Sequence, residues 1–359
     1  MFVWRERSAA GRVSDVRRSA QQPRAGWSSR RPGPTASVAG AASPTWVSVI
    51  DPPAGRPCAT APPATMSAVG VDRAVLSRIA TSERLERVVK TVPLGEAAAW
   101  RAASRYVAGR TRSQALDTAA TLLAQGHGIS VDLFGERVSD PGVADQVLED
   151  YTDLAGALPP PPADVWLSVD LTHLALDEDS SAAADRLATI ARALPAGRLV
   201  QVGAEDAART DAVLACVLDV AARGLASRIG ATLQANLLRS PADAETLAKG
   251  GVHIRLVKGA YVGATGVYPY GEATDVAFLR LAFELAERGT PWSMATHDAR
   301  LREALLLAHG PVAVEQLLGV RPEVLNELRA RAVPTRVYVP YGRNWFRYWL
   351  RLVAESRGA

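Results

Sequence analysis

The stretch His253-Ile-Arg-Leu-Val-Lys-Gly-Ala-Tyr261 decides the fold of this 359-residue chain. Isoleucine and leucine flank Arg255 in the two-residue period of a β-strand. Burying a cation is costly unless an anion or a hydrogen-bond acceptor meets it. A strand that carries Arg255 inward and ends at Lys258 is therefore expected to face a ligand. Gly259 then lets a backbone or a ligand come close.

Seven other apolar runs of similar length flank this one, and a helical segment follows each run. The predicted strands are Ile129–Leu133, Val165–Leu171, Arg198–Val202, Arg228–Leu233, His253–Val257, Trp292–Ala295, Val312–Leu317 and Arg336–Val339. The predicted helices span residues 141–157, 180–194, 205–223, 240–249, 273–288, 299–309, 321–331 and 343–356. Such alternation implies a parallel sheet, and eight units predict an α/β fold of the (βα)8 TIM-like barrel type. An open doubly wound sheet is the alternative, although no glycine-rich phosphate turn follows the first strand.

Three segments are predicted: a disordered extension over residues 1–65, helices over residues 66–127 and the catalytic barrel over residues 128–359. The extension holds nine arginines, nine prolines and only three carboxylates, a composition typical of disordered chains. Met66 begins a stretch that resembles an ordinary protein start, so an over-extended gene reading is the alternative account of the extension. Caps and apolar spacing predict helices that begin near Asp72 and Ser82 and others at Ala98–Val107 and Ser113–Gln125.

Charge and cysteine content limit the function classes. The chain carries a formal net charge of +4, and residues 1–65 alone carry +6, so the remainder is slightly acidic. An arginine-rich nucleic-acid arm is the alternative use of the extension, but aromatic residues are not interleaved there; no nucleic-acid partner is expected. Two cysteines imply no disulfide framework, and no apolar run is long enough to span a membrane. The expectation is a cytoplasmic protein.

The carboxyl ends of the predicted strands carry a polar rim, where barrel enzymes place their chemistry. Its members are Asp132, Phe134, Glu136, Asp170, His173, residues 203–206, Gln234, Asn236, Arg255, Lys258, Tyr261, Thr296, His297, Asp298, Glu315, Gln316, Tyr338, Tyr341 and Gly342. Arg255 and Lys258 either form structural ion pairs with protein anions that close the barrel, or belong to an anion or cofactor site. The chain uses three lysines against 38 arginines, so a lysine at 258 is not the default cation.

Two further motifs each have a functional and a structural interpretation. Thr296 and His297 lie between a strand and a helix, where backbone N–H groups can bind phosphate; alternatively, Asp298 merely caps that helix. The five histidines are scattered without metal-ligand spacing, so no metal is expected. Near the carboxyl terminus, Arg347 and Arg351 share a helical face. That helix either packs with its arginines in water or lies over the barrel mouth, where Arg351 reaches a carboxylate.

Taken together, these motifs resemble the proline dehydrogenase family of FAD-dependent (βα)8 barrels. The resemblance rests on IRLVKGAY (254–261), ATHD (295–298) and VYVPYG (337–342), followed by tryptophan, tyrosine and arginine at W..YW.R (345–351). Weaker support comes from VDLFGE (131–136), LS.DLTHL (167–174) and LQANL (233–237). The similarity runs in order from about residue 83 to the end of the chain.

The resemblance implies oxidation of L-proline to 1-pyrroline-5-carboxylate by hydride transfer from C5 to flavin N5, as a step of proline catabolism. Arg255 would be the catalytic residue beside N5. The implied FAD-binding residues are Gln234, Arg255, Val257, Lys258, Gly259, Thr296 and His297. The implied substrate positions are Asp170, Tyr338, Tyr348, Arg351 and Leu352. A quinone would reoxidise the flavin, with the protein peripheral at the inner face of the membrane.

The chain departs from the family pattern at the substrate end. Asp170 replaces a lysine, Leu352 replaces the second arginine of a carboxylate clamp, and Gly203 replaces an aspartate. The lysine-to-aspartate change lowers the charge of the pocket by two, the arginine-to-leucine change lowers it by one, and the aspartate-to-glycine change raises it by one, so the pocket is more negative by two. A lost bidentate arginine contact costs about 1.5–3 kcal/mol, or roughly 10- to 150-fold in affinity. The string EFQxLYG also becomes Ala313-Val-Glu-Gln-Leu-Leu-Gly319.

Three functional hypotheses follow. The first is a flavoprotein that oxidises proline or an analogue with a masked carboxylate. The second is a catalytically impaired barrel with a binding or regulatory role, and the third is a flavin-free lyase or aldolase that uses Lys258 as a Schiff base. We also expect Asp170 to replace the missing third-strand aspartate, because adjacent strands lie only about 5 Å apart.

Overall fold

The computed structural model describes residues 95–135, 137–259 and 265–356. Within them, eight parallel strands pair in sequence order and close into a barrel, with β8 hydrogen-bonded to β1. The strands are Gly128–Leu133 (β1), Val165–Val169 (β2), Val200–Val202 (β3), Ile229–Gln234 (β4), His253–Val257 (β5), Trp292–Ala295 (β6), Ala313–Leu317 (β7) and Thr335–Tyr341 (β8). The predicted TIM-like barrel is confirmed, and the open-sheet alternative is wrong.

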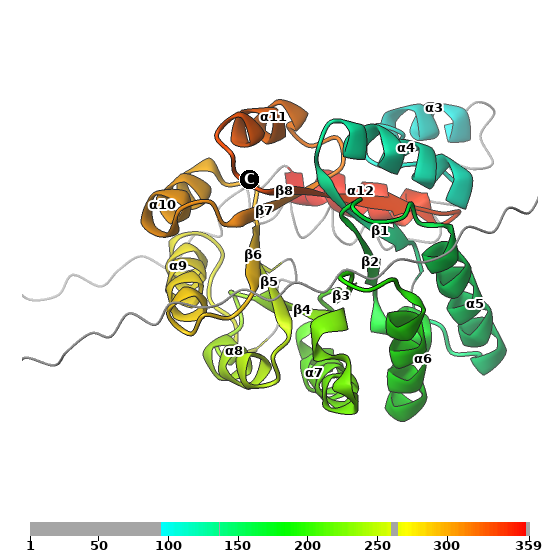
Figure 1. Cartoon of the computed structure of the whole chain (residues 1–359), viewed down its shortest axis with the longest axis horizontal. Helices are drawn as coiled ribbons and strands as arrows, with labels where there is room; N and C mark the ends of the chain where they lie inside the picture. Colours follow the sequence, from blue (N-terminus) through cyan, green and yellow to red (C-terminus); the bar gives the residue numbers. More distant parts are fainter. Residues whose placement is uncertain (1–94, 136, 260–264, 357–359) are drawn as a thin grey trace, which may run out of the picture. The chain divides into compact units, whose positions relative to one another are not determined.

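Helices surround the strands (Figure 1). They are Gly95–Ala103 (α3), Arg112–Ala124 (α4), Pro141–Ala157 (α5), Ser180–Ala193 (α6), Thr210–Val220 (α7), Ser240–Lys249 (α8), Glu272–Glu287 (α9), Ala299–His309 (α10), Pro322–Ala330 (α11) and Trp345–Ser356 (α12). The α4 helix packs against β1 and β8, where the barrel closes. Valine, leucine and isoleucine of the strands meet the helices in one continuous core, which supplies the apolar burial that stabilises the fold.

Local signals set several helix starts. Asp140, Asp179 and Asp298 accept hydrogen bonds from backbone N–H groups of the first turns of α5, α6 and α10. Such caps satisfy donors that a helix leaves without partners. Pro141 occupies the first turn of α5, where its fixed φ and missing N–H cost nothing. The sequence therefore locates these helices closely.

Some boundaries differ from the prediction. The second strand ends at Val169 rather than Leu171, because Leu171–Leu174 forms a 3₁₀ turn that redirects the chain. The third strand begins at Val200, and the following helix begins with a 3₁₀ turn at Ala207–Arg209 before α7. The predicted caps Asp72 and Ser82, together with the extension at residues 1–65, lie outside the described residues.

The amino-terminal end of the barrel interior is filled by polar and aromatic side chains. Arg336 donates to both carboxylate oxygens of Asp164 at 2.6 and 2.7 Å, and its guanidinium carbon lies 3.3 Å from the centre of the Trp166 ring. Trp166 in turn meets the His253 ring edge-on, with ring centroids 4.9 Å apart. This end of the barrel is therefore closed, and the opposite end is the one available to ligands.

The last helix is fixed by a separate aromatic cluster. Trp345 of α12 contacts Trp100 of α3, with ring centroids 5.0 Å apart, and also Phe346. Ala99 and Ala103 of α3 and Val107 also belong to this cluster. Aromatic pairs of this kind add about 0.5–1.5 kcal/mol beyond the area they bury. The α3 helix therefore holds α12, although the two are far apart in the sequence.

Candidate functional site

Arg255 lies across the barrel interior rather than at its surface. Its Nε–H donates to Glu315 on β7 at 2.8 Å, and its Nη2 donates to Ser130 on β1 at 3.3 Å. The Arg255 and Glu315 side chains are only 9% and 3% exposed. Ser293 on β6 donates to the other Glu315 oxygen at 2.5 Å. The buried cation therefore has a protein anion, as the structural interpretation of this residue predicts.

The ion pair keeps Arg255 and Glu315 charged and leaves some N–H donors of Arg255 available. Burial acts to raise the pKa of Glu315, but the Arg255 and Arg336 guanidinium groups outweigh it and hold the pKa below its usual range. A guanidinium has five N–H donors, and Glu315 and Ser130 account for two of those on Arg255. Arg255 can therefore be held by Glu315 and still donate to a ligand.

Lys258 lies at the end of β5 between two aspartates. Its Nζ is 2.6 Å from Asp275 of α9 and 2.9 Å from Asp298, the cap of α10. Burial acts to lower the pKa of Lys258, yet hydrogen bonds to Asp275 and Asp298 hold the pKa above its ordinary value. A Schiff-base lysine needs a neutral amine, so this environment disfavours the lyase or aldolase hypothesis. Asp298 both caps the helix and binds Lys258.

Gly259 has no room for a side chain. Its φ of +103° lies in the region that favours glycine, and a β-carbon there would overlap the Asn236 amide. Val257, two residues earlier, pairs with Gln234 of β4 and Ala295 of β6 and is half-buried. The absence of a side chain at position 259 therefore lets the Asn236 amide pack directly against the backbone after β5.

Two polar side chains near this backbone keep unsatisfied atoms. Gln234 donates from Nε2 to the Glu205 carbonyl at 3.0 Å, but its buried Oε1 has no partner among the described residues. The buried Nδ1 of His297 is likewise without a partner there. Burial, with Arg321 and Arg302 nearby, lowers the pKa of His297 to about 4, so the ring is neutral. Buried polar atoms without partners are costly, and a polar ligand would satisfy them.

Thr296 has a local role beside His297. It is 6% exposed, and its Oγ1 accepts the Asp298 N–H at 3.1 Å. This bond shapes the turn from β6 into α10. Five of the predicted cofactor residues, Gln234, Val257, Gly259, Thr296 and His297, thus come from three adjacent strand ends. Among the residues that the structure describes, no group of histidine, cysteine and acidic side chains could hold a metal ion.

A second polar cluster, the Asp132 cluster, lies at the β1 side of the mouth and consists of Asp132, Tyr151 and Tyr338. Asp132 accepts a hydrogen bond from the Tyr151 hydroxyl of α5 at 3.0 Å and another from the Tyr338 hydroxyl of β8. Burial, together with Asp132 and Asp170, raises the pKa of Tyr151 and of Tyr338 well above the ordinary value. Both tyrosines are therefore neutral donors.

Tyr151 was not predicted as a site residue. The sequence offers one signal for it: Tyr151 shares the buried face of α5 with Val147 and Leu154. A buried tyrosine hydroxyl usually needs a hydrogen-bond partner. His173 is also buried beside Tyr151, with ring centroids 6.3 Å apart. A β-carbon at Gly135 would overlap the His173 ring, so the loop after β1 packs directly on that histidine.

The last helix reaches the mouth at the same side. The Tyr348 ring lies 4.7 Å from Phe134 and 6.3 Å from Tyr338, measured between centroids. Leu352 is 6% exposed. Arg351 belongs to α12, but its side chain lies outside the described part of the chain, as do Glu136 and Tyr261. The helix therefore lies over the mouth at Tyr348, and the arginine contact stays a prediction.

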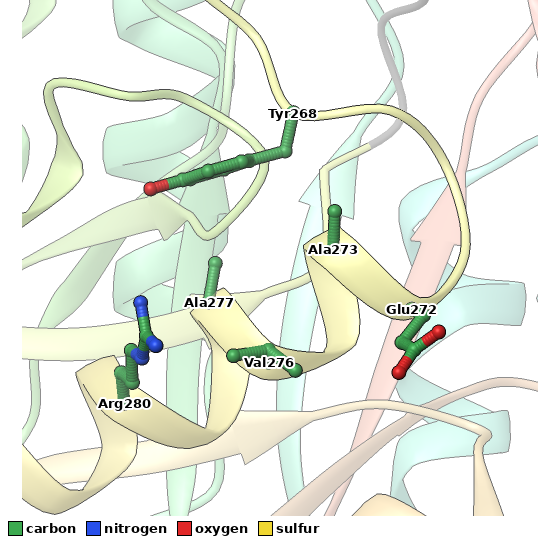
Figure 2. A pocket seen from close by; sticks show the side chains of 6 residues that line it. All are labelled: Tyr268, Glu272, Ala273, Val276, Ala277 and Arg280. Atoms are coloured by element: carbon green, nitrogen blue, oxygen red, sulfur yellow. The ribbon is translucent and has the colours of Figure 1, made fainter. Parts of the chain in front are cut away.

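The structure also has a shallow surface hollow, which is lined by other residues. Its volume is about 380 Å³, and it lies on α9, where the Tyr268 ring covers part of the helix (Figure 2). The other lining residues are Glu272, Ala273, Val276, Ala277 and Arg280. None of the predicted site residues lines it. The candidate site is therefore the barrel mouth, where the unsatisfied polar atoms and the paired charges lie.

Comparison with known proteins decides the family. Residues 115–355 match the sequence profile described as "Proline dehydrogenase". The chain is 30% identical to "Proline dehydrogenase" of Deinococcus radiodurans over 269 residues, which cover 72% of this chain and 87% of that protein. It belongs to the proline dehydrogenase family. "Proline dehydrogenase 1" of Bacillus subtilis strain 168 is also 30% identical, over 70% of this chain and 86% of that protein.

Solved structures agree with membership of the proline dehydrogenase family at the level of the fold. Proline utilization A from Bdellovibrio bacteriovorus, inactivated by N-propargylglycine, superposes with a TM-score of 0.67 at 20% identity. The similarity covers 80% of this chain but only 36% of that much longer one. Proline utilization A from Corynebacterium freiburgense gives a TM-score of 0.60 at 17% identity, over 81% of this chain and 34% of that one. These similarities support the barrel.

The chain is therefore an enzyme of the proline dehydrogenase family. Membership of this family implies a small-molecule substrate and a flavin cofactor. In the described part of the chain, no helix combines the length and the apolar character needed to cross a membrane. The geometry fits a flavin at the ends of β4, β5 and β6, because the unsatisfied buried atoms of Gln234 and His297 lie there.

Proposed function

We propose that this protein oxidises L-proline to 1-pyrroline-5-carboxylate, with FAD as its cofactor and a quinone as the final electron acceptor. The observation that carries the proposal is the match to curated proline dehydrogenases over most of their length. The barrel mouth supports it, since the expected cofactor residues come together there. When bound, FAD supplies the two-electron acceptor for a hydride from C5 of the substrate.

The residues that would hold FAD divide into two kinds. Gln234 and His297 would meet its polar atoms directly, because both have unsatisfied polar atoms, and the Gly259 backbone, packed against Asn236, would line the site. Lys258 would act mainly by position, since Asp275 and Asp298 already share its charge. It holds the ends of β5, α9 and α10 together around the site.

Arg255 is the proposed catalytic residue, and Glu315 is its positioning residue. The 2.8 Å ion pair and the Ser130 contact fix the guanidinium inside the barrel. Preorganised donors stabilise developing charge because they do not need to reorient during the reaction. In this chain the carboxylate of Glu315 replaces the glutamine of the family string, so the guanidinium is partly neutralised.

The substrate would lie between the Asp132 cluster and α12. Tyr338 and Tyr348 form one wall, and the Leu352 side chain is buried on the same helix. Covering the mouth with α12 excludes water, which strengthens electrostatic interactions inside the site. Two alternatives remain distinct from proline oxidation: oxidation of a proline analogue with a masked carboxylate, and a barrel that binds without turnover.

The decisive experiment is the visible spectrum of the purified protein with added FAD, before and after anaerobic addition of L-proline. A yellow protein that proline bleaches supports the proposal. A flavin spectrum that proline leaves unchanged, but that proline amide or ester bleaches, assigns the masked substrate. A protein that fails to retain FAD contradicts the proposal and supports a binding or regulatory role. Quinone use is tested by adding a soluble quinone and measuring flavin reoxidation.

A further inference from the structure

Asp170 and Gly203 lie against each other at the mouth of the barrel. The N–H of Gly203 donates to the Val169 carbonyl at 2.9 Å, which ties the ends of β2 and β3 together. A β-carbon at position 203 would overlap the Asp170 carboxylate. The φ of Gly203 lies outside the left-handed region, so its backbone does not require glycine. The glycine instead leaves room for the carboxylate.

Asp170 does not use its carboxylate for its own turn. It occupies the N-cap of the 3₁₀ turn Leu171–Leu174 but makes no side-chain capping bond, although aspartate at such a position usually does. Its backbone is extended. Trp166, four residues earlier, meets Arg336 of β8 inside the barrel. The two-residue period of a strand places Asp170 on the same face, directed into the mouth.

The surroundings of Asp170 combine acidic and aromatic side chains. Asp132 is bound by the hydroxyls of Tyr151 and Tyr338, and Tyr338 stacks toward Tyr348 of α12. Asp170 itself already makes contacts within the protein. A carboxylate has about four acceptor positions, so those contacts and a ligand cation can share it. This sector of the mouth therefore favours a cation over an anion.

We propose that Asp170 binds the protonated ring nitrogen of the substrate and takes up the one N–H proton that has to leave before C5 can release a hydride, and that Gly203 is glycine to admit this carboxylate. The two positions then act as one specificity unit for a cyclic secondary amine. This inference rests on the proposed oxidation of proline. A secondary amine is cationic at neutral pH, and charge-assisted hydrogen bonds to a carboxylate are strong. The carboxylate of the substrate is directed away from Asp132 and Asp170 toward α12, because like charges repel.

The first test uses binding instead of turnover. Pyrrolidine carries the ammonium without a carboxylate, and cyclopentanecarboxylate carries the carboxylate without an amine. Titrating each into the FAD-loaded protein and following the flavin absorbance gives two dissociation constants. We expect Asp170→Ser to weaken pyrrolidine binding by about tenfold or more, and to leave cyclopentanecarboxylate binding unchanged or tighter. An Asp170→Ser protein that keeps its pyrrolidine affinity overturns the inference.

The second test moves the carboxylate to the neighbouring strand. Gly203→Asp alone should weaken pyrrolidine binding, because its β-carbon displaces Asp170. The double variant Asp170→Ser, Gly203→Asp should recover most of the affinity lost in Asp170→Ser. Gly203→Ala should likewise be harmful in the wild type and neutral in the Asp170→Ser background. Additive losses in this cycle overturn the inference.

These measurements separate the inference from the proposed function. If proline fails to bleach the flavin of the wild type, proline oxidation is wrong, whereas the preference for pyrrolidine over cyclopentanecarboxylate still reports on Asp170. If proline is oxidised but Asp170→Ser binds both probes as the wild type does, only the amine assignment is wrong. Thermal unfolding of each variant, measured alongside, identifies any that fails to fold, and the double variant then carries the test.

Discussion

At the scale of single residues, the site depends on side chains whose type is set by a distant neighbour. Position 259 must be glycine because the Asn236 side chain occupies the space of a β-carbon there. Arg255 can be buried because Glu315 accepts its hydrogen bond. Asn236 follows β4 and Glu315 lies within β7, so in each case the partner comes from another part of the barrel. A substitution at such a position also disturbs the neighbouring side chain, so it should destabilise the protein more than an ordinary surface substitution does.

Gly259→Ala should be more harmful than a matched glycine substitution. Gly271 has nearly the same φ, +107° against +103°, but nothing lies within 4 Å of a β-carbon there. Gly271→Ala therefore reports backbone strain alone, about 1–3 kcal/mol, and Gly259→Ala adds the overlap with Asn236. The free energy of unfolding in urea and the amount of FAD that each purified variant retains test this prediction. Equal losses in the two variants would show that space at position 259 is unimportant.

Glu315→Ala should destabilise the protein by about 3–5 kcal/mol, because it leaves Arg255 buried without its anion. Glu315→Gln keeps an acceptor for Arg255 and Ser293, so it should cost less. The folded pKa of Glu315 is lowered by Arg255 and Arg336 against the effect of burial. Its contribution is therefore present above the unfolded pKa of about 4.5 and is lost as pH falls through the lower folded value.

The check for Glu315 is urea unfolding of the wild type and both variants between pH 7 and pH 3.5. The difference between wild type and Glu315→Ala should shrink toward the acid end. A difference that stays constant across this range would mean that the charge of Glu315 does not stabilise the fold.

At the scale of elements, α12 connects the substrate side of the mouth to α3. Trp345 anchors the helix on Trp100, and Tyr348 of the same helix faces Phe134 and Tyr338. One face of α12 thus provides stability and another contacts the site. Loss of the anchor should therefore appear as a binding defect as well as a stability defect.

Trp345→Ala should cost roughly 3–5 kcal/mol of stability, as expected for truncating a buried large aromatic residue. It should also raise the KM for the substrate more than it reduces retained FAD, because Tyr348 moves with the helix while Gln234 and His297 stay in place. Trp345→Phe is the matched control, which keeps a ring against Trp100. Unfolding curves and steady-state kinetics test this, and an unchanged KM in Trp345→Ala would contradict it.

At the scale of the whole molecule, burial of histidines determines the response to acid. Burial lowers the pKa of His173, His253 and His297 to about 4, from an ordinary value of 6.5. Between these values the unfolded chain binds protons that the folded barrel does not. Folded stability therefore falls as pH decreases from about 6.5 to about 4.

The slope of unfolding free energy against pH should reach at most about 4 kcal/mol per pH unit in this range, since each proton contributes about 1.4. His253→Gln should reduce the slope by about a third. Urea unfolding at half-unit pH steps measures it. A wild-type stability that does not change between pH 6.5 and pH 4.5 would contradict the prediction.

The sequence by itself determined the barrel and much of the candidate site. Periodicity and caps are local, so α5, α8 and α10 begin and end where predicted. The IRLVKGAY motif likewise places Arg255 on the fifth strand and Lys258 directly after it. Most of the predicted cofactor residues lie on neighbouring strand ends because the carboxyl ends of parallel strands meet at one rim.

Only the tertiary structure decided which side chains meet. Glu315 as the partner of Arg255, Tyr151 as a donor to Asp132, and Asp170 in the space left by Gly203 all join residues from different strands or helices. Sequence spacing does not encode these distances, because closure of the barrel brings together positions far apart in the chain. The end of β2 at Val169 has the same origin, since the 3₁₀ turn that follows is buried and its Thr172 donates to Glu205, which follows β3.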